Sequence, residues 1–168
     1  MILVAALALA TPRQDYAKAH DAWTETHRIY DGWDNALTVR ATLLSAQMRD
    51  ARAARTADMT GEDVVSDPSG NDSLSFVLTI ATASRDDDEL AGAQQAWTFH
   101  ATRNGASCGP AALTRVKFPT PLDRGLNPKL TRWDTLWIAR FDPCTSVGTI
   151  TLTVDGPRGH GAMQWNAQ

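Results

Sequence analysis

Residues 149–154 read Thr-Ile-Thr-Leu-Thr-Val and alternate strictly between polar and apolar side chains. Because successive side chains of a strand point to opposite faces, Ile150, Leu152 and Val154 share one face. Five further runs of strand-like composition, several separated by Gly and Pro turns, lie at 74–83, 96–102, 112–118, 133–141 and 160–165. The pattern predicts an antiparallel, immunoglobulin-like β-sandwich over residues 74–165.

The part before this sandwich contains a predicted hairpin and helix. Residues 24–44 carry the turn dipeptide Asp31-Gly32, and apolar and polar residues alternate after it, which predicts a hairpin; a continuous helix is the main alternative. Ser45 is suited to cap a helix that runs to about Met59 and ends at Gly61. One or two helical turns are expected over 15–23. The predicted fold is therefore mainly β with some α, with the hairpin and one helix of residues 20–60 packed on the sandwich or joined to its edge.

Length and composition indicate one globular domain. The chain has 168 residues, 16 Lys and Arg against 19 Asp and Glu, a net charge of −3, 43% hydrophobic residues and 21% charged residues. These values exclude a disordered chain and a strongly basic nucleic-acid binder. No apolar run reaches the roughly 18–20 residues that a transmembrane helix needs. We expect a single domain over residues 11–168, with no nucleic-acid partner, no transmembrane segment and no cofactor.

The first ten residues, Met-Ile-Leu-Val-Ala-Ala-Leu-Ala-Leu-Ala, are typical of the apolar part of a secretory signal peptide. Ala8-Leu9-Ala10 fits the small-residue cleavage pattern, so we expect processing before Thr11. The segment lacks basic leading residues, which fits either a signal peptide truncated at its start or an atypical one. The alternative is a short buried helix or strand. On this basis we expect a periplasmic or extracellular location.

Two cysteines, Cys108 and Cys144, form an even pair, and both lie in turn-like surroundings. In an oxidising compartment such a pair is expected to form a disulfide, and two loop tips can meet at one end of a sandwich. The alternative is two unpaired thiols. A nucleophilic cysteine is disfavoured, because no histidine motif accompanies either one.

Charge is distributed unevenly along the chain. Residues 61–95 hold eight acidic and one basic residue, and they include a predicted acidic loop at 61–73. The run Asp86-Asp87-Asp88-Glu89 is a weak candidate for Ca²⁺ binding, and a solvated turn is the alternative. Residues 96–168 hold eight basic and four acidic residues. Five of these basic residues form a candidate binding surface for anionic lipid headgroups or a polyanionic envelope polymer: Arg115, Lys117, Arg124, Lys129 and Arg132. The alternative is that they pair with the acidic block.

The chain contains six tryptophans, which is many for this length. Trp133 and Trp137 share a face of the run 133–141 if that run is a regular strand, and Leu136 and Ile138 occupy the other face. Apolar residues on both faces predict a central strand with both indoles buried between the sheets, packed against five apolar residues: Phe76, Leu78, Ile80, Ile150 and Leu152. Trp33, beside a turn, is the tryptophan that we expect to be exposed and the sixth residue of the candidate binding surface.

Scattered Trp, Pro and Gly residues carry a resemblance to a protein family. They lie in two groups: Trp23-Thr24, Ile29-Tyr30-Asp31-Gly32, Ser45 and Met48-Arg49, and then Trp97, Asn104-Gly105, Pro110, Pro119, Pro121, Pro128, Trp133, Phe141, Gly156-Pro157, Gly159 and Trp165. The pattern resembles an uncharacterised family of exported bacterial envelope proteins, often lipid-anchored, over residues 20–60 and 74–165. No cysteine lies near the predicted cleavage point, where an anchored member would carry one. The resemblance implies an envelope location and this fold, and it implies no catalytic residues.

Motifs for catalysis are missing from the sequence. No HExxH, CxxC, GxSxG or phosphate-binding glycine loop occurs, and the four histidines are scattered. We therefore favour a non-catalytic structural or protein-binding role in the envelope, with an envelope protein or surface component as the partner. The alternatives are a carbohydrate-binding module that uses exposed tryptophan, and a hydrolase whose site is assembled from residues distant in sequence.

Overall fold

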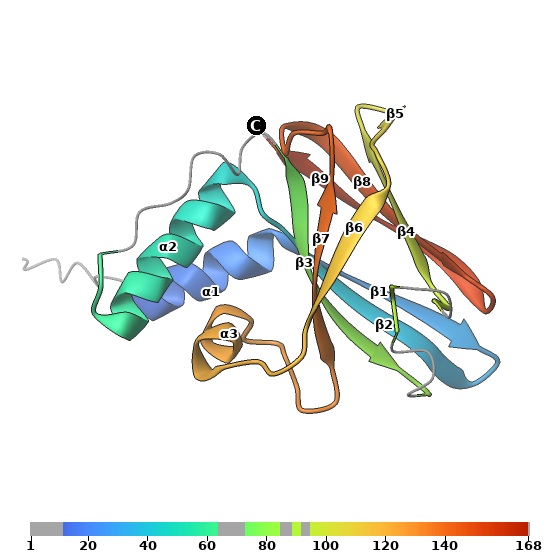
Figure 1. Ribbon diagram of the computed structural model, residues 1–168, viewed down its shortest axis with the longest axis horizontal. Coiled ribbons are helices and arrows are strands. Elements are labelled where there is room, and N and C mark those ends of the chain that lie inside the picture. The colour runs from blue at the N-terminus through green and yellow to red at the C-terminus, as the bar shows by residue number, and fades with distance from the viewer. Residues whose placement is uncertain (1–11, 64–72, 85–88, 92–94, 168) are drawn as a thin grey trace, which may run out of the picture.

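A computed structural model describes residues 12–63, 73–84, 89–91 and 95–167. The predicted signal segment, most of the acidic loop and Asp86–Asp88 lie outside these residues. In the described part, nine strands form two antiparallel sheets, and three helices lie on one side of the strands (Figure 1). The prediction of a mainly β protein with a β-sandwich is confirmed.

The five-stranded sheet has the order β1-β2-β3-β7-β6. Its strands are β1 (Thr24–Asp31), β2 (Asp34–Leu43), β3 (Leu74–Thr82), β6 (Ala111–Val116) and β7 (Thr135–Phe141). The predicted hairpin is thus part of the sandwich itself, because β2 pairs along its length with β3. Of the two placements that the sequence left open, joining the sheet is the one observed.

The four-stranded sheet has the order β5-β4-β8-β9. It contains β4 (Thr98–Arg103), β5 (Ala106–Ser107), β8 (Gly148–Gly156) and β9 (Gly159–Ala167). Asn104 and Gly105 join β4 to β5 with φ values of 50° and 81°. Two consecutive positive φ values are the mark of a type I′ hairpin turn, the connection that Asn-Gly favours.

The core lies between the two sheets and includes Trp97, Trp137 and Trp165. Phe76 packs edge-on against Phe141, with 5.9 Å between ring centroids, and against Trp165 at 5.2 Å. The five apolar residues that the sequence assigned to the core around Trp137 are all buried. The interior is therefore formed by the residues that alternate inward along each strand, as period-two patterning predicts.

Three helices are present where one full helix was expected: α1 (Pro12–Ala22), α2 (Ala46–Thr60) and α3 (Pro121–Leu126). Ser45 caps α2 by accepting a hydrogen bond from the Met48 amide, and Gly61 ends it in a left-handed conformation, as predicted. The helices have a small apolar cluster of their own, centred on Tyr16, Met48 and Leu126. None of the described helices is long and apolar enough to span a membrane.

Trp133 contradicts the prediction that it is buried. Its side chain is 69% exposed, whereas that of Trp137 is 1% exposed. The strand begins only at Thr135, because residues 131–134 form a turn in which the Asp134 carboxylate accepts a hydrogen bond from the Thr131 amide. Trp133 belongs to this turn and does not share the inward face of β7. The strand is central, as expected, since β7 lies between β3 and β6, but its outer face is buried only in part: Leu136 is 2% exposed and Ile138 is 41% exposed.

Candidate functional site

A groove of about 550 Å³ lies where β3 and β6 end and β7 begins. Its lining includes Arg115 and Lys117 from the end of β6, Arg124 from α3, and Arg132 and Trp133 from the turn before β7. We call this feature the basic groove. Its volume lies within the range of about 300–1,000 Å³ that is typical of small-molecule sites.

Local sequence signals fix the segment that carries Arg124. Thr120 caps α3 by accepting a hydrogen bond from the Asp123 amide, and the Asp123 carboxylate accepts one from the Thr120 amide at 2.8 Å. This reciprocal capping box, with Pro121 at the first helical position, starts a helix directly after β6. Arg124 is thereby held against the groove in the last turn of the short helix.

The turn before β7 fixes Arg132 and Trp133. The Trp133 amide donates to the Thr131 hydroxyl, and the Arg132 guanidinium carbon lies 4.5 Å from the centroid of the Trp133 ring. The Arg115 guanidinium lies over the buried Trp137 ring at 5.7 Å. Two of the groove's guanidinium groups are therefore positioned over indole rings, a favourable contact for an arginine.

Among the described residues, the basic groove is lined by more positive than negative side chains. Asp134 lines the groove, but its side chain is only 3% exposed and pairs with Arg40 at 3.3 Å. Arg115 pairs with Glu89 at 3.6 Å, with both side chains partly exposed. Among the residues that the structure describes, Lys117, Arg124 and Arg132 form no ion pair. The arrangement is suited to binding an anion.

The predicted binding surface is brought together only in part. Arg115, Lys117, Arg124 and Arg132 all line the basic groove. Lys129 instead pairs with Asp21 of α1 at 2.8 Å and lies by a separate shallow hollow. Trp33 lies fully exposed in the β1–β2 turn, as predicted, and does not line the groove.

Trp133 lines the groove, whereas the sequence predicted that it would be buried between the sheets. Thr131 and Asp134 flank the Arg132-Trp133 pair, and both residue types favour turns through hydrogen bonds from side chain to backbone. That local signal could have separated Trp133 from the strand.

The weak calcium candidate has one residue in the described part of the chain, Glu89, and that residue pairs with Arg115. Asp86, Asp87 and Asp88 lie outside it. Across the described ranges, no group of three or more His, Cys, Asp or Glu side chains is placed to hold a metal ion. The alternative for the basic cluster was pairing with the acidic block at 61–95. The described residues show one such ion pair, Arg115–Glu89. Much of that block lies outside the described residues.

Among the described residues, the groove lining includes no Ser, Cys or His. His20 lies elsewhere, buried between α1 and the five-stranded sheet. Burial and the nearby Lys129 and Arg52 charges together lower its pKa to about 4, against the opposing effect of Asp21. The groove therefore offers cations and an aromatic ring for binding, without a nucleophile paired to a base.

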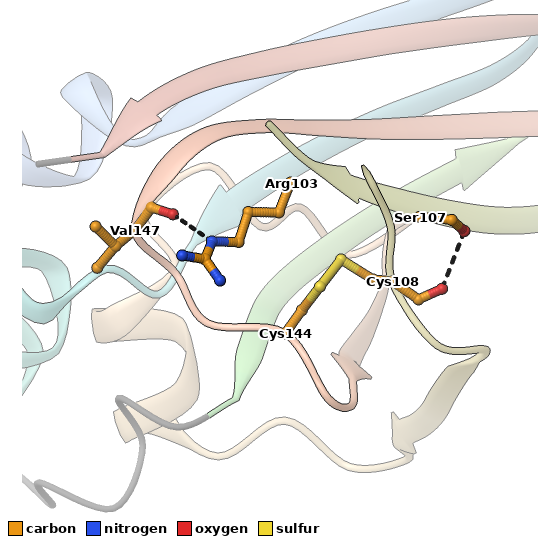
Figure 2. Close-up of a disulfide and its surroundings, with 5 residues drawn as sticks. All are labelled: Arg103, Ser107, Cys108, Cys144 and Val147. Atoms are coloured by element: carbon orange, nitrogen blue, oxygen red, sulfur yellow. Dashed lines mark hydrogen bonds between the residues drawn. A yellow bond between two sulfur atoms is a disulfide. The ribbon is translucent and has the colours of Figure 1, made fainter. Parts of the chain in front are cut away.

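Cys108 and Cys144 form the predicted disulfide, with 5.7 Å between their Cα atoms (Figure 2). Both lie in segments where the chain crosses between the sheets, Cys108 between β5 and β6 and Cys144 between β7 and β8. In the same region the Arg103 side chain donates to the Val147 carbonyl at 2.9 Å. Described residues include no unpaired cysteine, which leaves no thiol for nucleophilic chemistry.

Comparisons with family models, with curated proteins and with solved structures found no match to this chain.

Proposed function

We propose that this protein is an exported protein of the bacterial cell envelope with a non-catalytic binding role, and that the basic groove holds an anionic envelope component. The observation that carries this proposal is the concave surface lined by four cations, three of them without an ion pair among the described residues. A concave cluster of one charge sign concentrates ligands of the opposite sign.

Export is supported by two independent features. Residues 1–10 are typical of a secretory signal segment with a cleavage pattern at its end. The disulfide between Cys108 and Cys144 is of a kind that persists in oxidising compartments and is rare in the cytosol.

The processing test uses the chain expressed in a bacterium with its own N-terminus. We expect the protein in the periplasm or medium, with an intact mass that corresponds to a first residue of Thr11. A protein that stays in the cytoplasm with residues 1–10 attached would rule out export by this segment.

The binding test measures retention of the purified protein on washed envelope material at low and high salt. Neutralising the groove with Lys117→Gln and Arg132→Gln should reduce retention, and Arg140→Gln is the matched control. Arg140 is exposed near the other end of β7 and does not line the groove. Equal retention of the groove variant and the control would remove the groove from the proposal.

Carbohydrate binding gains one specific observation, the exposed Trp133 at the groove. Trp133 and Trp137 do not form a sugar-stacking platform together, because Trp137 is buried in the core. The groove instead offers a single indole beside a cluster of cations, which differs from a platform of two stacked-on indoles.

A further inference from the structure

We infer that the ligand of the basic groove is an acidic carbohydrate, a short run of sugar rings that carry carboxylates. The inference rests on the proposed function and deepens it by naming the ligand class. It is carried by two features that occur together, guanidinium groups in a hollow and an exposed indole among them.

The guanidinium groups supply recognition of the charge. Arg115, Arg124 and Arg132 reach the groove from three different segments, the end of β6, α3 and the turn before β7. A guanidinium presents a planar fork of N–H donors that matches the two oxygens of a carboxylate. Donors spread over three segments fit a ligand with repeated anionic groups better than a single small anion.

Trp133 supplies recognition of the ring. Its side chain is 69% exposed at the groove, so the indole is accessible to a ligand that binds there. A sugar ring has an apolar C–H face that packs on an aromatic ring, and its polar edge stays available for hydrogen bonds. A free phosphate or an aspartate-rich peptide would neutralise the arginines without covering the part of the indole that Arg132 leaves exposed.

The concave shape distinguishes a soluble oligomer from a membrane surface. The cations line a hollow of about 550 Å³, whereas charges that engage lipid headgroups need to reach a broad flat surface. Trp33 and Phe118 are more exposed than Trp133, and neither lines the groove. Among the described aromatic residues that are exposed, Trp133 is the one that lines the groove.

The test measures affinity by calorimetry for a tetramer of galacturonic acid, with probes that share one property each. A neutral galactose tetramer has the rings without the charge, a tetraglutamate peptide has the charge without the rings, and inorganic phosphate and phosphatidylglycerol vesicles represent the phosphate sources. We expect the uronate tetramer to bind at least about tenfold more tightly than each of the others, a difference of roughly 1.4 kcal/mol. The affinity should fall with added salt.

Two variants separate the contribution of the indole to uronate binding from that of a guanidinium group. Trp133→Ala should weaken uronate binding by about 3–10-fold and leave tetraglutamate binding unchanged, as expected for loss of one stacking contact. Trp33→Ala is its matched control, since it removes an exposed tryptophan outside the groove and should change neither. Arg132→Gln should weaken binding of both charged probes by about 10–100-fold, the loss expected for a charge-assisted hydrogen bond, and Arg140→Gln should not.

Two outcomes separate the inference from the function on which it rests. The sugar class would be overturned if tetraglutamate, phosphate or vesicles bound as tightly as the uronate, or if Trp133→Ala had no effect on uronate binding. In either case the proposed function would stand as long as retention on envelope material still depended on the groove. If Lys117→Gln and Arg132→Gln changed neither the binding of any probe nor envelope retention, both proposals would fall together.

Discussion

Trp133 and Trp137 lie four residues apart and have opposite surroundings. Trp137 is enclosed in the core and donates a hydrogen bond to the Thr135 hydroxyl at 3.1 Å, while Trp133 sits in the turn outside the strand. Because only Trp137 is buried, a large loss of stability is expected on its replacement and not on replacement of Trp133.

Trp137→Ala should lower the free energy of unfolding by about 3–5 kcal/mol, the cost of leaving a large cavity in a packed core. Trp133→Ala should change it by less than about 0.5 kcal/mol, as for an exposed side chain. Urea denaturation of both variants and the parent protein measures the two values. Equal losses at the two positions would contradict the exposed placement of Trp133.

Gly156, at the end of β8, lies against the ring of the buried Trp97. A Cβ added at this position would come within 2.2 Å of a ring carbon. Gly156→Ala should therefore cost about 1–3 kcal/mol of stability through overpacking. Gly125→Ala is the matched control, because the added Cβ would meet only the flexible end of Met59, and its loss of stability should be clearly smaller. A control variant as unstable as Gly156→Ala would show that the close contact with Trp97 is not the cause.

Helix α1 is joined to the five-stranded sheet through a buried polar cluster. His20 is 3% exposed, its Nδ1 lies 3.3 Å from the Thr24 hydroxyl, and its Nε2 lies 3.5 Å from the Thr42 hydroxyl. The Thr24 hydroxyl also donates to the His20 carbonyl at 2.6 Å. Burial, together with the nearby Lys129 and Arg52 charges, lowers the pKa of the ring to about 4.

The low pKa of His20 makes stability depend on pH. Between pH 6.5 and about 4 the unfolded chain binds a proton at this histidine and the folded protein does not, so acid favours unfolding. The free energy of unfolding should be highest above pH 6.5 and should fall by about 3 kcal/mol on acidification to pH 4. Urea titrations of the parent and of His20→Gln over this range give the measurement. The variant should lose most of this pH dependence, and identical slopes would contradict the assignment.

Element boundaries show where sequence signals were sufficient. The Ser45 cap and the Gly61 end of α2 appear as predicted, because each depends on hydrogen bonds or backbone angles within a few residues. Helix α3 was missed, although its capping box at Thr120 and Asp123 is also local. The surrounding prolines favoured an extended connection and hid a helix of only six residues.

At the scale of the whole molecule, the disulfide joins two segments that cross between the sheets. It links Cys108 to Cys144 across a sequence separation of 36 residues. Replacing both cysteines with alanine should lower the free energy of unfolding by about 3–4 kcal/mol, the entropy cost of closing a loop of this length in the unfolded chain. Denaturation of the variant, with the reduced parent protein as the control, measures the loss. A double variant as stable as the oxidised parent would contradict a structural role.

The candidate site shows a similar division between local and long-range information. Four of the six predicted surface residues meet in the groove, because they lie in the stretch 115–132 that connects two adjacent strands. Lys129 lies in the same stretch but faces Asp21, which is distant in sequence. Its partner could not be found from local composition.

Sequence alone determined the class of this protein's fold, its hairpins, its main helix and the cysteine pair. Each of these follows from alternation, caps, turn residues or an even count of thiols, which act over short distances along the chain. The tertiary structure alone decided the strand order β1-β2-β3-β7-β6, the burial of His20 and the exposure of Trp133. These depend on which distant segments share a sheet and where a strand begins, because burial is a property of the packed neighbours and not of the residue itself.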